Sequence, residues 1–167
     1  DEKGELLEEA IKDSKAQNVL ELGVYLGYST IRILKNLNKN SQLTSLEANE
    51  KFASIAKEHI SIAGLSKNHI LKVGKSSELI TTLKEPFDFV FIDHWKDLYL
   101  IDLKLLESLG LLKQGAWIFA DNVVLFNLED YLDYVRTSPN YLSQFIPTLR
   151  EYSKSHPDGI EISKYSS

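Results

Sequence analysis

Two short runs of the sequence place oxygen-bearing side chains directly after apolar segments. They are Phe91-Ile92-Asp93-His94-Trp95-Lys96 and Phe119-Ala120-Asp121-Asn122. If each apolar segment is a buried parallel strand, the side chains that follow meet at one edge of the sheet. Asp93, Asp121 and Asn122 would then form an all-oxygen site, which suits a hard cation such as Mg²⁺. Alternatively, each aspartate caps a following helix. Their joint occurrence beside Lys96 favours the metal site.

A glycine-containing turn is the second feature that could serve a function. Gly23 and Gly27 in the segment 21–29 permit a tight strand-to-helix turn and a close approach of a ligand to the backbone. The dinucleotide signature G-x-G-x-x-G is absent, which favours a nucleoside without a pyrophosphate. Two glycines at such a junction can also serve packing alone.

Glu47 ends the next expected strand, 24 positions after Gly23. An acid at this place can accept hydrogen bonds from both ribose hydroxyls of an adenosine group, or it can be a solvated carboxylate. Trp95 can stack on an adenine ring or pack against the sheet. His59, His69 and His156 show no ligand spacing, and we expect them at the surface.

Strands and helices alternate along most of the chain, which predicts a parallel sheet with helices on both faces. Apolar runs predict strands at 19–22, 43–46, 70–73, 87–92 and 116–120, and periodic patterns predict helices at 4–15, 28–37, 53–63, 77–83, 99–109 and 128–136. Two last strands, at 141–149 and 160–165, are expected to form an antiparallel hairpin with its turn at Pro157-Asp158-Gly159. One α/β domain over residues 1–167 is predicted.

The composition excludes several classes of function. A net charge of -5 argues against a general binder of nucleic-acid backbones, and the absence of cysteine excludes disulfides and thiolate metal sites. No apolar run approaches the ~20 residues needed to cross a bilayer, and the first residues do not form a signal peptide. The absence of methionine leaves room for a longer natural N-terminus. We expect a cytoplasmic monomer with no nucleic-acid partner and no membrane segment.

These residues, in this order, resemble the catechol O-methyltransferase family over nearly the whole chain, apart from a short deletion near 84–88. The most specific match is Asp93-His94-Trp95-Lys96-Asp97, and further matches are Leu20-Glu21-Leu22-Gly23, Gly27-Tyr28-Ser29, Ala63-Gly64-Leu65, Gly110-Leu111-Leu112 and Ala120-Asp121-Asn122-Val123. The resemblance implies a Rossmann-like class I methyltransferase fold with a mostly parallel seven-stranded sheet. It also implies that a methyl group moves from S-adenosylmethionine to one hydroxyl of a catechol, with Mg²⁺ orienting the diol.

The resemblance further implies a role for each matching residue. The residues expected to bind the cofactor are Gly23 in the turn, Glu47 at the ribose, Glu21, Tyr25 and Ser29 at the methionine end, and Ala48, Ser76, Asp93, His94 and Trp95 around or near the adenosine. The implied metal ligands are Asp93, Asp121 and Asn122. Lys96 matches the general base, and Glu151 matches the acid that holds the second catechol hydroxyl.

Some positions depart from the family pattern, and other functions stay open. Phe126 stands where the family has proline, Arg150 where it has an apolar wall residue, and Ser77 where it has glutamine. One alternative is a methyltransferase for another vicinal diol, such as a caffeoyl-type compound. Another is a cofactor-binding module with little or no turnover, against which the presence of Lys96 and Glu151 speaks. An NAD-dependent oxidoreductase would explain the fold but not the missing third glycine or the oxygen cluster.

Overall fold

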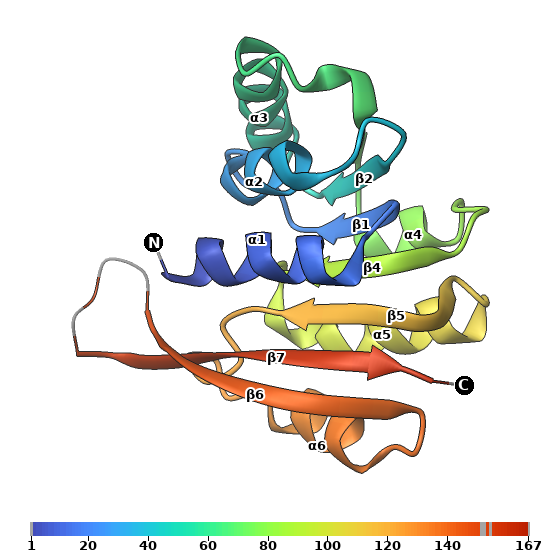
Figure 1. Ribbon diagram of the computed structural model, residues 1–167, viewed down its shortest axis with the longest axis vertical. Helices are drawn as coiled ribbons and strands as arrows, with labels where there is room; N and C mark the ends of the chain where they lie inside the picture. The colour runs from blue at the N-terminus through green and yellow to red at the C-terminus, as the bar shows by residue number, and fades with distance from the viewer. Residues whose placement is uncertain (1, 151–152, 154, 167) are drawn as a thin grey trace.

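The computed structural model describes residues 2–150, 153 and 155–166 (Figure 1). Its strands are β1 (Asn18–Leu22), β2 (Gln42–Glu47), β3 (His69–Val73), β4 (Phe87–Ile92), β5 (Leu112–Ala120), β6 (Tyr141–Leu149) and β7 (Pro157–Tyr165). Its helices are α1 (Glu2–Ser14), α2 (Tyr28–Asn36), α3 (Glu50–Ile62), α4 (Ser76–Ile80), α5 (Tyr99–Ser108) and α6 (Glu129–Thr137), with short 3₁₀ turns η1 (Ser66–Asn68) and η2 (Lys96–Leu98). Within the described residues, no helix is long and apolar enough to span a membrane.

The strands form one seven-stranded sheet in the order β3-β2-β1-β4-β5-β7-β6. Neighbouring strands from β3 to β5 are parallel, and β7 pairs antiparallel with both β5 and β6. The chain order reverses between β1 and β4, which is where doubly wound sheets bind their ligands. The expected Rossmann-like arrangement, a mostly parallel seven-stranded sheet with an antiparallel C-terminal hairpin, is confirmed.

Helices cover both faces of the sheet because successive strand residues point to opposite sides (Figure 1). Val19 of β1 and Phe89 of β4 lie in a core cluster with apolar residues of α1, α2 and α3. Leu20 and Val90, the next residues along each strand, lie in a second cluster with residues of α4, α5 and α6. These two cores hold the central strands rigidly, so the loops at their carboxyl ends start from fixed positions.

The predicted turn at Pro157-Asp158-Gly159 is wrong, because these residues begin strand β7. Gly159 pairs with Pro147 and Asp158 with Thr148. Asp158 is buried, and its carboxylate accepts hydrogen bonds from residues far away in the sequence. A Cβ on Gly159 would collide with the Phe145 ring, so glycine here allows the ring to cross the strand. The turn-like composition therefore reflects tertiary contacts.

Gly23 allows the loops after β1 and β4 to touch. It has a positive φ of 92°, a backbone region that favours glycine. A Cβ at this position would lie 2.5 Å from the backbone oxygen of Asp93. A side chain here would force the two loops apart at the edge of the sheet.

We therefore predict that Gly23→Ala lowers the free energy of unfolding by roughly 3 kcal/mol or more. Gly110→Ala is the matched control, because Gly110 also has a positive φ (66°), but a Cβ added there would meet no atom within 4 Å. That control should cost only about 1 to 2 kcal/mol, the strain of the left-handed backbone. Urea unfolding of both variants measures the difference. Equal costs would show that the contact with Asp93 is unimportant.

Candidate functional site

The carboxyl ends of four parallel strands meet at one edge of the sheet. In the strand register Leu22 lies beside both Leu46 and Ile92, and Ile92 lies beside Ala120. Backbone hydrogen bonds extend this alignment one residue further: the Asp93 nitrogen donates to the Leu22 oxygen at 2.9 Å. Residues that follow β1, β2, β4 and β5 are thereby gathered in one place.

Glu21 is the most deeply buried of the predicted cofactor residues. Its carboxylate accepts hydrogen bonds from Ser29 Oγ at 2.6 Å, Thr30 Oγ1 at 2.8 Å and Ser45 Oγ at 2.6 Å. Burial raises the pKa of Glu21 to about 7, although these hydroxyl donors lower it and the nearby Asp93 charge raises it further. The structure brings Glu21 and Ser29 together, as the sequence predicts. An acid in this environment favours a cationic ligand group beside it.

Glu47 closes β2 and organises the turn after β1. Its Oε2 atom accepts from the backbone nitrogens of Val24 at 3.0 Å and Tyr25 at 2.9 Å, and its Oε1 atom accepts from Asn49 at 2.8 Å. The Tyr25 side chain is exposed and packs edge-on against Phe52, with ring centroids 4.7 Å apart. Glu47 and Tyr25 therefore line the same stretch of the edge.

A buried carboxylate behind the edge orients two of the residues expected near adenosine. Asp102 is fully buried, and it accepts from Ser76 Oγ at 2.5 Å and from His94 Nε2 at 2.7 Å. Trp95 is 76% exposed, so its ring face is not packed against the sheet. Ala48 is also exposed. These residues border an open surface at the edge.

The three predicted metal ligands lie together. Asn122 Nδ2 donates to Asp93 Oδ1 at 2.8 Å, and the Asn122 backbone nitrogen donates to Asp121 Oδ1 at 2.6 Å. Asn122 has a positive φ of 59°, which turns its side chain back toward Asp93. The described part of the chain holds no cluster of three or more His, Cys, Asp or Glu side chains suited to a metal. The predicted ligand set instead combines two carboxylates with one amide.

Lys96 lies beside this group, as the sequence predicts. Its Nζ atom is 2.9 Å from Asp93 Oδ1 and donates to the Tyr99 hydroxyl at 2.7 Å. The Tyr99 hydroxyl in turn donates to the Asp121 carbonyl at 2.9 Å. Burial raises the pKa of Tyr99, so this hydroxyl keeps its proton. The Phe126 ring covers Lys96, with Nζ 5.1 Å from its centroid.

A second lysine, Lys3 of α1, contacts the same group. Its Nζ atom lies 2.9 Å from Asp121 Oδ1, 2.8 Å from Asn122 Oδ1 and 2.6 Å from Asp158 Oδ2. Lys3 is 5% exposed. In Figure 1, the arrow of β5 points toward the end of the molecule at which α1 begins. The edge therefore carries two lysine ammonium groups among its carboxylates.

Sequence reasoning missed Lys3, Tyr99, Asp102 and Asp158. Lys3 had a detectable signal, because it precedes Leu7 and Ile11 at intervals of four on the apolar face of α1. A lysine on such a face needs a buried anionic partner. No local pattern distinguishes Asp102 or Tyr99 from other residues of α5.

One residue predicted for the site lies outside the described part of the chain, and the expectation for one histidine is wrong. Glu151, the expected substrate-binding acid, lies outside the described residues. His69 is not a simple surface residue: it is half-buried, its Nε2 atom lies 2.9 Å from Ser45 Oγ, and burial lowers its pKa to about 4.

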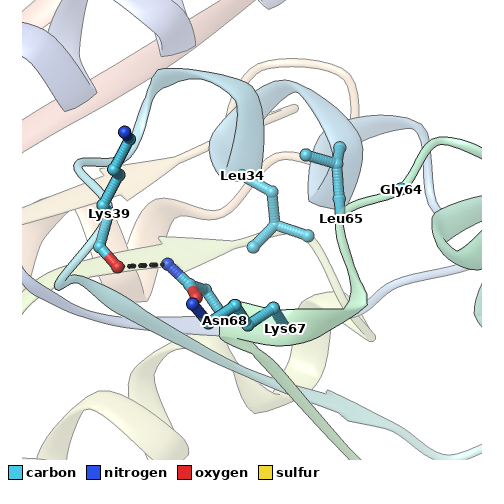
Figure 2. Close-up of a pocket in the computed structure, with 6 residues that line it drawn as sticks. All are labelled: Leu34, Lys39, Gly64, Leu65, Lys67 and Asn68. Atoms are coloured by element: carbon cyan, nitrogen blue, oxygen red, sulfur yellow. Dashed lines mark hydrogen bonds between the residues drawn. The ribbon is translucent and has the colours of Figure 1, made fainter.

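Figure 2 shows a hollow lined by Leu34, Lys39, Gly64, Leu65, Lys67 and Asn68. It adjoins the amino ends of β2 and β3, away from the predicted site.

The sequence of this chain is similar to those of known O-methyltransferases. The sequence model of a family described as O-methyltransferase matches residues 1–135. The chain is 42% identical to catechol O-methyltransferase B of Danio rerio, over 99% of this chain and 64% of that protein. It is 36% identical to catechol O-methyltransferase of Sus scrofa, over 98% of this chain and 90% of that protein.

Solved structures agree with the sequence comparison. The O-methyltransferase from Bacillus cereus in complex with SAH superposes with a TM-score of 0.88 at 27% identity, covering 99% of this chain and 81% of that one. This chain spans only 64% of the length of the Danio rerio protein.

The raised pKa of Glu21 gives a testable pH dependence. Because the folded state holds the Glu21 proton up to about pH 7 and the unfolded state releases it near 4.5, stability is lost as pH rises through this window. The parent should lose roughly 2 to 3 kcal/mol relative to Glu21→Gln between pH 5 and pH 8. Urea unfolding at both pH values measures this, with exposed Glu50→Gln as control. Parallel pH profiles for the parent and Glu21→Gln would contradict the account.

Proposed function

Because the chain belongs to the O-methyltransferase family, we propose that it transfers a methyl group from S-adenosylmethionine to one hydroxyl of a catechol, with Mg²⁺. The family resemblance noted in the sequence is confirmed by relatives that are catechol O-methyltransferases. The observation that carries the proposal is the convergence of Asp93, Asp121 and Asn122 with Lys96 at one edge of the sheet.

The ligand group fits a divalent cation by two criteria. Asp93, Asp121 and Asn122 offer oxygen atoms, the donors that Mg²⁺ prefers, and they leave room for water or substrate oxygens. In addition, a positive group of the chain itself, the Lys3 ammonium, already contacts Asp121 Oδ1 and Asn122 Oδ1. Oxygens that attract one cation in a buried setting can bind another. Mg²⁺ bound by these three residues is therefore part of the proposal.

The opposite end of the edge supports binding of S-adenosylmethionine. The related Bacillus cereus enzyme was solved with SAH. In this proposal Glu21 and Ser29 bind the methionine amino group, and Glu47 binds the ribose. In the present structure Glu47 holds the loop amides of Val24 and Tyr25. Because the Asn49 backbone nitrogen also donates to Oε1, three of about four acceptor sites are in use, and Oε1 keeps capacity for one further donor such as a ribose hydroxyl. His94, Ser76, Trp95 and Ala48 would border the adenine.

In this proposal the protein positions the reacting groups and moves one proton. When bound, S-adenosylmethionine supplies the methyl group, and Mg²⁺ supplies positive charge that favours an ionised hydroxyl. Lys96 accepts the hydroxyl proton at Nζ, and the Tyr99 hydroxyl holds that atom in place through a 2.7 Å hydrogen bond. Phe126 limits the access of water to Lys96. Glu151 as the partner of the second hydroxyl stays a prediction, as does the monomeric state.

A methyltransferase for another vicinal diol is the nearest alternative. Phe126 is 52% exposed beside Lys96, and Arg150 is exposed at the end of β6. In the family that the sequence resembles, Phe126 replaces a proline and Arg150 replaces an apolar wall residue. An assay on a panel of catechols and caffeoyl-type diols separates the two functions. The same assay tests the remaining alternative, a cofactor-binding module, because that module would bind S-adenosylmethionine without turnover.

The metal requirement is tested with Asp121→Ala. Methyl transfer from labelled S-adenosylmethionine to 3,4-dihydroxybenzoate should need Mg²⁺ and fall at least ~100-fold in the variant, because a dication is held by fewer oxygens. Asp97→Ala, which removes an exposed acid from the turn after β4, is the control and should keep activity. Binding of S-adenosylmethionine should persist in both variants. Full parent activity in excess chelator would refute the metal requirement.

The base is tested with two substitutions of Lys96. Lys96→Ala should lower kcat by ~10² to 10⁴-fold, the usual contribution of a general base. Lys96→Arg should not restore it, because a guanidinium stays protonated. Lys113→Ala, remote at the start of β5, is the control. If the arginine variant turns over at nearly the parental rate, Lys96 contributes only charge.

A further inference from the structure

Lys3 occupies an unusual position for a lysine. Its side chain is 6% exposed, and its ammonium contacts oxygens of two predicted metal ligands, Asp121 and Asn122, at 2.9 and 2.8 Å. Buried lysines are rare unless they are paired, because removing an ammonium from water is costly. The contacts of Lys3 are therefore specific, and they lie at the oxygens that a divalent cation would use.

Asp158 provides a second position for the same ammonium. Its Oδ2 atom lies 2.6 Å from Lys3 Nζ, and its Oδ1 atom accepts from the backbone nitrogens of Val124 and Leu125. Burial opposes ionisation, but the hydrogen bonds from Lys3 and from backbone amides lower the pKa of Asp158 below its ordinary value. Asp158 is thus a fixed carboxylate, outside the three predicted ligands, to which Lys3 can remain bound.

The amide of Asn122 is turned by these contacts. Its Oδ1 atom faces Lys3, while its Nδ2 atom faces Asp93 Oδ1 at 2.8 Å. An amide nitrogen does not bind Mg²⁺, whereas the amide oxygen does. Turning the oxygen toward Asp93 would bring the NH₂ group against the Lys3 ammonium, and both groups are donors. Binding of a cation between Asn122 and Asp93 is therefore linked to a retreat of Lys3.

We propose that Lys3 is an internal counter-cation that holds the metal ligands in the metal-free protein and competes with the divalent ion for them. The inference rests on the proposed metal site and goes beyond it. Lys3 balances the charge of Asp121 and fixes the Asn122 amide when no metal is bound. When a divalent cation enters, Lys3 gives up these two residues and keeps Asp158. The cost of this exchange weakens divalent binding.

A different role for Lys3 predicts the opposite effect. If Lys3 only anchors α1 to β7 through Asp158, its loss loosens the edge, and divalent affinity falls or is unchanged. If Lys3 competes with the metal, its loss leaves the ligand oxygens available, and affinity rises. The sign of the change in affinity therefore separates the two roles.

The experiment is isothermal titration of the full chain with Mg²⁺, and with Mn²⁺ as a second probe, in the presence of S-adenosylmethionine. Lys3→Met should lower Kd at least tenfold. Lys12→Met, on the last turn of the same helix, is the matched control and should leave Kd unchanged. The double variant Lys3→Met/Asp158→Asn removes one positive and one negative charge, so its formal net charge equals that of the parent. It also avoids a stranded buried carboxylate that could unfold the single variant.

The outcomes are distinct. Tighter binding in both the single and the double variant supports competition by direct contact. Tighter binding in the single variant alone assigns the effect to net charge and overturns the inference. Unchanged or weaker binding in both variants also overturns it, while the proposed metal site stands. If neither the parent nor any variant binds Mg²⁺ or Mn²⁺, the proposed metal site and the inference fall together.

Discussion

Negative charge gathered at one sheet edge is the constraint on which the rest of the structure depends. Asp93 contacts Lys96, and Asp121 and Asp158 both contact Lys3. These carboxylates lie in a partly buried setting, where they need nearby cations. Lys96 supplies one ammonium from the turn after β4, and Lys3 supplies another from α1. The parallel register brings Asp93 and Asp121 together and the antiparallel strand β7 adds Asp158, while α1 and the turn after β4 bring the lysines. The site therefore places two ammonium groups among three carboxylates before any ligand enters.

This arrangement of charges connects the fold with the proposed chemistry. The contact between Gly23 and the Asp93 backbone brings the loops after β1 and β4 close together, so the proposed cofactor site and the proposed metal site share one surface. Tyr99 ties Lys96 to the Asp121 carbonyl, which links the proposed base to the proposed ligands. Precise positioning of this kind is the main contribution a protein makes to group transfer.

Much of this could be predicted from the sequence because the signals are local. Apolar runs and helical periodicity predict the strands and helices, and Asp93 and Asp121 are found because they directly follow strands. Lys3 and Asp158 were not found, since their roles depend on each other across 155 positions. The hairpin turn was misplaced for the same reason: turn chemistry cannot be separated from a tertiary contact in the sequence alone.

The most direct test of the account is a crystal structure with Mn²⁺, S-adenosylhomocysteine and a catechol, in which anomalous scattering locates the metal. We expect one anomalous peak bounded by oxygens of Asp93, Asp121 and Asn122, with the catechol oxygens beside it. Lys3 Nζ should have left Asn122 and should remain on Asp158. An unchanged Lys3 contact with Asn122, or a peak at another place, would contradict the account.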